Sequence, residues 1–136
     1  MKLILLVEDS KFLRMANARA LGRAGFRVIT ANDGEEALKV VVDDRPDLIL
    51  LDMLLPKMGG VEVLRALRNN PGTSKTPIVV ITGLAKSNES KLKSEGADGF
   101  FEKSKLEEGA DSFIQMVNSF LKEARDGHEM PCPSRA

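Results

Sequence analysis

Polar side chains that could take part in catalysis or bind a metal follow four short apolar segments of this sequence, each at the point where the segment ends. The set consists of two acids after residues 3–7, one acid after 48–51, a hydroxyl after 78–81 and an amine after 100–101: Glu8, Asp9, Asp52, Thr82 and Lys103. Carboxylates held close together repel one another and favour a cation among them. Mg²⁺ suits such a group, because it is held by one or two carboxylates, waters and an incoming phosphate. A lysine and a hydroxyl would then stabilise the phosphoryl oxygens, and one carboxylate would attack phosphorus to give an aspartyl phosphate.

Each of these residues also has a simpler interpretation. Asp52 alone could cap a turn, and Glu8 and Asp9 could interact with the positive end of the helix that follows them. Thr82 alone is a threonine at the end of a strand, and Lys103 alone is a solvated lysine. Only the combination favours chemistry.

The elements that must position these residues are predicted from the hydrophobic pattern. Continuous apolar runs at 3–7, 48–51 and 78–81 are typical of strands buried on both faces, and residues 27–31 and 100–101 predict two more. Helical patterns lie between the strands, the first capped by Ser10 and closed by Gly25, the second opened by Asp33 with Glu36 as a capping box. Strands that alternate with helices predict an α/β fold with a parallel sheet. The carboxyl ends of such strands meet at one edge, which would gather the five polar residues.

The bulk composition limits the classes of function. The 136 residues indicate one domain, with 43% hydrophobic and 29% charged residues. Lys and Arg number 20, as do Asp and Glu, so no net charge draws the chain to nucleic acid or an anionic membrane. The single Cys132 cannot form an intrachain disulfide, and no run approaches the ~20 apolar residues of a membrane span. We therefore expect a cytoplasmic protein with one domain at residues 1–125, and a flexible tail at 126–136, where Gly127 and two prolines occur.

At this point the sequence closely resembles the receiver domains of two-component response regulators. The resemblance covers residues 2–124 and depends on the joint order and spacing of several short motifs. These are Val7-Glu8-Asp9, Leu51-Asp52-Met53-Leu54-Leu55-Pro56 with Gly60, Ile81-Thr82-Gly83, Gly96-Ala97-Asp98 and Phe100-Phe101-Glu102-Lys103. The resemblance implies a flavodoxin-like (βα)5 three-layer sandwich, with a parallel five-stranded sheet in the order 2-1-3-4-5.

The resemblance also implies a role for each residue. Asp52 would accept a phosphoryl group from a phosphohistidine of a sensor histidine kinase or a histidine phosphotransfer protein. Mg²⁺ would be placed by Glu8, Asp9, Asp52 and the backbone carbonyl of Leu54. Thr82 and Lys103 would bind the phosphoryl group, and Phe100 would be the aromatic switch residue that turns inward with Thr82.

Two departures from the family pattern affect the site. Ser104 follows Lys103, where the family usually has a proline that favours a cis peptide, and a cis bond before a non-proline residue costs ~2.5–4 kcal/mol. Leu54 and Leu84 stand two residues after Asp52 and Thr82, at positions that flank the phosphoryl group. Leucines there would exclude water, so we expect slow hydrolysis of the phosphorylated state.

The sequence is thus interpreted as a stand-alone phosphorylation switch that catalyses only its own phosphotransfer and dephosphorylation. Output would be a changed surface around the segment 86–95, the fifth strand and the last helix, read by an effector protein or by a phosphorylation-dependent homodimer, without direct nucleic-acid contact or membrane insertion. Two alternatives stay open: a degenerate receiver that binds proteins without phosphorylation, and a fragment of a larger response regulator or hybrid kinase. A phosphatase of the haloacid dehalogenase type is disfavoured, because Leu54 stands where that class has a second Asp.

Overall fold

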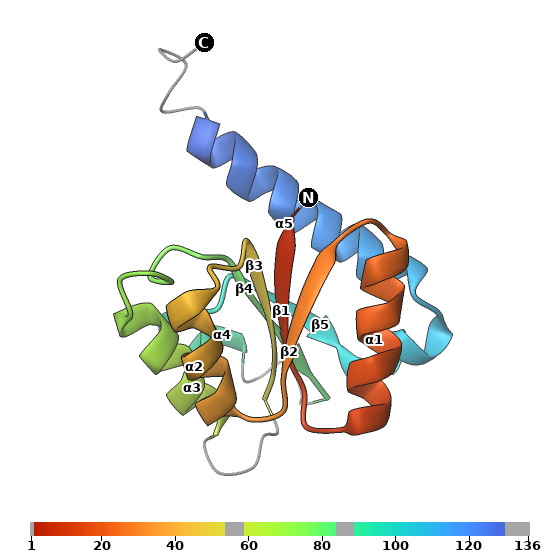
Figure 1. Ribbon diagram of the computed structural model, residues 1–136, viewed down its shortest axis with the longest axis horizontal. Coiled ribbons are helices and arrows are strands. Elements are labelled where there is room, and N and C mark those ends of the chain that lie inside the picture. The colour runs from red at the N-terminus through yellow and green to blue at the C-terminus, as the bar shows by residue number, and fades with distance from the viewer. Residues whose placement is uncertain (1, 54–58, 84–88, 130–136) are drawn as a thin grey trace.

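The computed structural model describes residues 2–53, 59–83 and 89–129, and in these ranges strands and helices alternate along the chain (Figure 1). The elements in order are β1 (Leu3–Val7), α1 (Lys11–Arg23), β2 (Arg27–Ala31), α2 (Gly34–Asp43), β3 (Leu48–Asp52), α3 (Gly60–Asn69), β4 (Ile78–Thr82), α4 (Glu89–Ser94), β5 (Gly99–Glu102), the 3₁₀ helix η2 (Lys103–Glu108) and α5 (Asp111–Glu129).

The five strands form one parallel sheet in the order β2-β1-β3-β4-β5. Val7 pairs with Leu51 across β1 and β3, and Asp52 pairs with Ile81 across β3 and β4. The predicted flavodoxin-like arrangement is therefore confirmed. Helical crossovers connect strands that run in the same direction, as parallel pairing requires.

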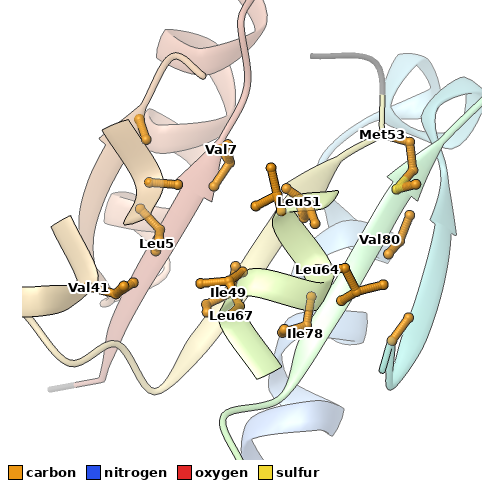
Figure 2. Close-up of a cluster of buried hydrophobic side chains, with 14 of the residues drawn as sticks. Leu5, Val7, Val41, Ile49, Leu51, Met53, Leu64, Leu67, Ile78 and Val80 are labelled. Carbon is orange, nitrogen blue, oxygen red and sulfur yellow. The ribbon is translucent and has the colours of Figure 1, made fainter. Parts of the chain in front are cut away.

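Helices cover both faces of the sheet and make three layers: α2, α3 and α4 lie on one face, and α1 and α5 on the other (Figure 1). Figure 2 shows the core on the first face, where alternate strand residues such as Leu5, Ile49 and Val80 meet Val41 of α2 and Leu64 of α3. The residues between them in the strands, such as Leu6 and Leu50, pack on the second face. Because both faces are covered, the strand segments 3–7, 48–51 and 78–81 are apolar throughout, whereas the edge strand β2 keeps the exposed Arg27 and Thr30.

The second face contains the aromatic part of the core. Phe101 of β5 and Phe113 of α5 lie with their ring centroids 5.4 Å apart, and Val117 and Leu121 continue the buried stripe of α5. A Cβ atom added at Gly99 would overlap the ring of Phe120. Glycine at the start of β5 therefore allows α5 to approach the sheet closely.

The predicted helix starts are confirmed by their caps. The Ser10 hydroxyl accepts a hydrogen bond from the Leu13 amide (3.3 Å), and the Asp33 carboxylate accepts one from the Glu36 amide (2.8 Å). The Glu36 carboxylate accepts from the amide of Asn32 (2.6 Å), one residue before the N-cap. Gly25 follows α1 with a φ of +99°, a left-handed conformation that glycine adopts without steric cost. Helix α1 thus begins directly after Glu8 and Asp9.

Helix α5 extends past Asp126, where the sequence predicted the start of a flexible tail. Helix α5 continues to Glu129 and passes through Gly127, and its last turns extend beyond the sheet (Figure 1). A single glycine costs a helix only ~1 kcal/mol, and the first residue that must interrupt the helix, Pro131, comes two residues after its end. The interval 130–136 lies outside the described residues.

The described helices include none with the length and apolar character needed to cross a bilayer.

Candidate functional site

The parallel sheet brings the predicted site residues to one edge. Asp52 is the last residue of β3, and Glu8 immediately follows β1, which pairs with β3 in register. Thr82 ends β4 beside β3, and Lys103 follows β5 beside β4. Because the strands are parallel and neighbours in the sheet, residues up to 95 positions apart, from Glu8 to Lys103, lie at the same edge.

Three carboxylates form the centre of this edge. One oxygen from each of Glu8, Asp9 and Asp52 lies within 4.8 Å of the other two. Glu8 and Asp52 are buried, with relative exposures of 2% and 1%, whereas Asp9 is exposed. Hydrogen bonds hold both the backbone and the side chain of Glu8. Its amide donates to the Ala31 carbonyl (3.0 Å), and its carboxylate accepts from the Ser10 amide (3.1 Å).

Lys103 provides the positive charge. Its ammonium group donates to Oδ2 of Asp52 at 2.9 Å and lies 4.0 Å from Oε1 of Glu8. Burial acts to lower the pKa of Lys103, but the hydrogen bond and charge of Asp52, followed by the charges of Glu8 and Asp9, outweigh it and raise the pKa. Lys103 therefore stays protonated and directed at Asp52.

The acid cluster raises the pKa of Glu8 from 4.5 to about 7. Burial contributes most, followed by a hydrogen bond with Asp52; the charge of Asp52 adds to this, while the Ser10 amide and Lys103 act in the opposite direction. Without a cation, the three acids thus hold more negative charge than one lysine offsets.

A pH dependence of stability follows. In the metal-free protein, folded Glu8 holds a proton between pH 4.5 and about 7 that the unfolded chain has released, so the free energy of unfolding falls as pH rises through this range. Glu8→Gln should remove the loss and stabilise the protein at pH 8 by on the order of 2 kcal/mol, with little effect at pH 4.5. Urea denaturation followed by far-UV circular dichroism in a chelator would measure this. An equal gain at both pH values would contradict the assignment to Glu8.

The donor set fits a hard divalent cation. Mg²⁺ prefers carboxylate oxygens and keeps several waters, and the cluster combines buried carboxylates with the exposed Asp9. The repulsion that raises the pKa of Glu8 is the interaction that such a cation would relieve.

The structure describes some of the remaining predicted site residues fully, one by its backbone only, and two not at all. The backbone of Thr82 ends β4 at this edge, but the position of its hydroxyl is outside what the structure describes, as are Leu54 and Leu84. Phe100 is half-buried and packs against the core on the face of α2, α3 and α4. The Lys103–Ser104 peptide is trans, and Ser104 is exposed.

Sequence reasoning missed Arg14. Its Nη1 donates to the backbone carbonyls of Glu8 (2.9 Å) and Asp9 (3.3 Å), directly behind two of the three acids. The only signal for it in the sequence is a basic residue in the first turns of the helix that follows the acid pair.

Comparisons with known proteins agree with this geometry. Residues 4–115 match the family model described as "Response regulator receiver domain". The chain is 40% identical over 104 residues to the transcriptional regulatory protein CpxR of Escherichia coli (strain K12), covering 76% of this chain and 43% of that protein. It is 41% identical over 103 residues to the alkaline phosphatase synthesis transcriptional regulatory protein PhoP of Bacillus subtilis (strain 168), covering 75% of this chain and 42% of that protein.

A solved structure of the chemotaxis protein CheY4 of Vibrio cholerae superimposes with a TM-score of 0.81 at 30% identity, covering 88% of this chain and 98% of that one. The chain therefore belongs to the response regulator receiver domain family, whose general function is switching by phosphorylation. It spans less than half the length of the curated relatives it matches.

Proposed function

We propose that this chain is a phosphorylation switch in which Asp52 accepts a phosphoryl group from a phosphohistidine with the help of Mg²⁺. The observation that carries the proposal is the setting of Asp52, which is buried at the end of β3, bonded to Lys103 at 2.9 Å and within reach of two further acids. A carboxylate so placed is oriented as a nucleophile, with positive charge ready beside it.

The reaction transfers one phosphoryl group and needs no external oxidant or reductant. The phosphorus–nitrogen bond of the donor breaks as a bond forms between phosphorus and a carboxylate oxygen of Asp52. The electron pair of the broken bond stays on the imidazole nitrogen of the donor. In a separate hydrolysis reaction, water attacks phosphorus and the bond between phosphorus and the carboxylate oxygen of Asp52 breaks, which regenerates the carboxylate and releases inorganic phosphate.

The carboxylates of Glu8, Asp9 and Asp52, with the backbone carbonyl of Leu54, would hold Mg²⁺. When bound, the ion supplies positive charge that offsets the charge of the acids and of the phosphoryl oxygens. The ammonium of Lys103 would pass from Asp52 to a phosphoryl oxygen, because its present contact places it at the atom that phosphorylation changes. The Thr82 hydroxyl would donate to another phosphoryl oxygen.

For output, we propose the face formed by α4, β5 and α5, with Phe100 as the aromatic switch. Two features support this choice: α4 has only six residues, from which Leu92 joins the core, and Phe100 is only half-buried. A short helix with little buried area shifts at low free-energy cost, so phosphorylation could bias its position. The partner that binds this face would be an effector protein or a second phosphorylated copy of this chain.

Helix α1 offers a surface for the protein that donates the phosphoryl group, a sensor histidine kinase or a phosphotransfer protein in the cytoplasm. Phe12 and Met15 lie one turn apart on this helix with relative exposures of 79% and 51%. The helix carries four basic residues and no acidic one, and it starts two residues after Asp9. A donor with an apolar surface and an acidic rim would therefore dock beside Asp52.

The proposal is tested by intact-protein mass spectrometry after incubation with phosphoramidate and Mg²⁺. The expected result is a gain of one phosphoryl group that requires Mg²⁺, disappears in a chelator and is removed by hydroxylamine, which cleaves acyl phosphates. Absence of this gain, together with failure of fluoroberyllate and Mg²⁺ to bind, would instead identify a receiver that acts as a binding module without phosphorylation.

A further inference from the structure

We infer that Arg14 is a positioning residue for the metal site: it fixes the turn between β1 and α1, so that Glu8 and Asp9 present their carboxylates to a cation. This inference rests on the proposed function, since it concerns the binding of Mg²⁺ by the same acids.

The contacts of Arg14 are made to the backbone and not to the carboxylates. One nitrogen, Nη1, donates to two successive carbonyls, those of Glu8 at 2.9 Å and Asp9 at 3.3 Å. Because successive residues of an extended strand face opposite sides, two successive carbonyls converge on one nitrogen only where the chain turns. Arg14 thus holds the turn through which the chain leaves the sheet.

The stem of Arg14 is itself held by the helix. The Arg14 amide donates to the Ser10 carbonyl at 2.8 Å, and the Ser10 hydroxyl caps the same turn through the Leu13 amide. The guanidinium therefore connects the first turn of α1 to the two residues before its cap. Arginine suits this task, because Nη1 carries two N–H donors, one for each carbonyl, and is held in the rigid plane of the guanidinium.

Asp9 depends on this contact more than Glu8 does. The Glu8 carboxylate is buried and accepts from the Ser10 amide at 3.1 Å, so its direction is set without Arg14. Asp9 is exposed, so packing constrains its carboxylate little and its direction follows that of its backbone. Fixing the carbonyl of Asp9 limits the conformations that a cation must otherwise select, and this lowers the entropy cost of binding.

The test compares the Mg²⁺ affinity of the parent with that of Arg14→Met, by following backbone amide shifts of residues 8–10 in an NMR titration. Residues that orient metal ligands typically change metal affinity 10–100-fold, and for a turn that is also held by Ser10 we expect about a 10-fold rise in the Mg²⁺ dissociation constant. Arg19→Met, an exposed arginine on the same helix, is the matched control and should bind Mg²⁺ as the parent does.

Two further measurements separate positioning from charge and from general damage. Arg14→Lys keeps the charge, but its side chain is shorter and has no rigid guanidinium plane, so it should not hold both carbonyls and should bind Mg²⁺ nearly as weakly as Arg14→Met. Recovery of parental affinity by lysine would show that a positive charge at this position is sufficient, and would overturn the inference. Phosphorylation by phosphoramidate should need more Mg²⁺ in Arg14→Met yet reach a rate within about twofold of the parent at saturating Mg²⁺.

The outcomes distinguish this inference from the proposed function. If the parent binds Mg²⁺ and is phosphorylated, and Arg14→Met and Arg14→Lys both match its Mg²⁺ affinity within twofold, Arg14 has no positioning role and the proposed function stands. If the parent binds no Mg²⁺, both fail. A variant of Arg14 that loses its circular dichroism is replaced by Arg14→Gln, which keeps a donor on a shorter stem and should also raise the dissociation constant.

Discussion

Asp52→Asn is expected to abolish phosphoryl transfer to this chain and to leave the fold in place. The asparagine amide has nearly the size of the carboxylate, so the packing at the end of β3 is kept, but its oxygen is a far weaker nucleophile toward phosphorus. Intact-protein mass spectrometry with phosphoramidate and Mg²⁺ should therefore show no gain in mass where the parent gains one phosphoryl group.

In the absence of metal, Asp52→Asn should also change the pKa of Glu8. The hydrogen bond and charge of Asp52 are among the causes that raise the pKa of Glu8, so the pKa of Glu8 should fall in Asp52→Asn. A larger fraction of Glu8 is then ionised at neutral pH, and Glu8 becomes the main partner of Lys103, whose ammonium already lies 4.0 Å from it. NMR titration of the Glu8 carboxyl carbon would detect this shift.

Asp43→Asn is a suitable control, because this exposed aspartate ends α2 and precedes the start of β3, whereas the site lies where the strands end. It should be phosphorylated at the parental rate. Mg²⁺-dependent phosphorylation of Asp52→Asn at the parental rate, with lability to hydroxylamine, would place the acceptor on another residue and contradict the proposed function.

The fold and the site edge were predictable because they depend on short-range pattern and chirality. Apolar runs such as 48–51 have no polar residue to place toward solvent, so they must be buried on both faces, and right-handed crossovers then align the strand ends. Once the strands are parallel, Asp52 and Lys103 must meet at one edge, although 51 positions separate them.

Other features of the structure have no comparable pattern in the sequence. Arg14 acts through a long side chain that reaches backbone carbonyls, and any residue type offers a backbone carbonyl, so the sequence does not mark its partners. The continuation of α5 to Glu129 was not marked in the sequence for a related reason: a single glycine such as Gly127 is only a weak local signal against helix, so it does not show where the helix ends.

Arg68→Met should lower the free energy of unfolding by about 3 kcal/mol. The Arg68 side chain, only 19% exposed, donates to the carbonyls of Gly96 (3.0 Å), Thr73 (3.0 Å), Ser74 (3.2 Å) and Thr76 (2.7 Å), and to Asp98 at 2.6 Å. Hydrogen bonds of charged groups contribute roughly 1.5–3 kcal/mol each, and several are lost together, though not additively.

The loss of stability in Arg68→Met is not confined to the contacts of Arg68 itself, because Asp98 accepts a second hydrogen bond. The Oδ2 atom that accepts from Arg68 also accepts from the amide of Ile78 (2.8 Å), the first residue of β4. Arg68 thus joins the end of α3 to the start of β4 and to the turn before β5. Without it, the carboxylate of Asp98 loses its countercharge and the loop at 73–76 loses three acceptor contacts.

Arg65 offers a matched control one turn earlier on the same helix. It makes a bidentate pair with Glu95 at 2.6 and 2.7 Å, but its side chain is 57% exposed, so solvent screens the interaction. Arg65→Met should leave the melting temperature almost unchanged, whereas Arg68→Met should lower it by roughly 10 °C in a domain of this size. Because the chain has no Trp or Tyr, far-UV circular dichroism is the suitable probe of both melts. Equal shifts for the two variants would show that burial and backbone contacts add nothing to the ion pair, and that the connection from α3 to β4 and β5 is maintained without Arg68.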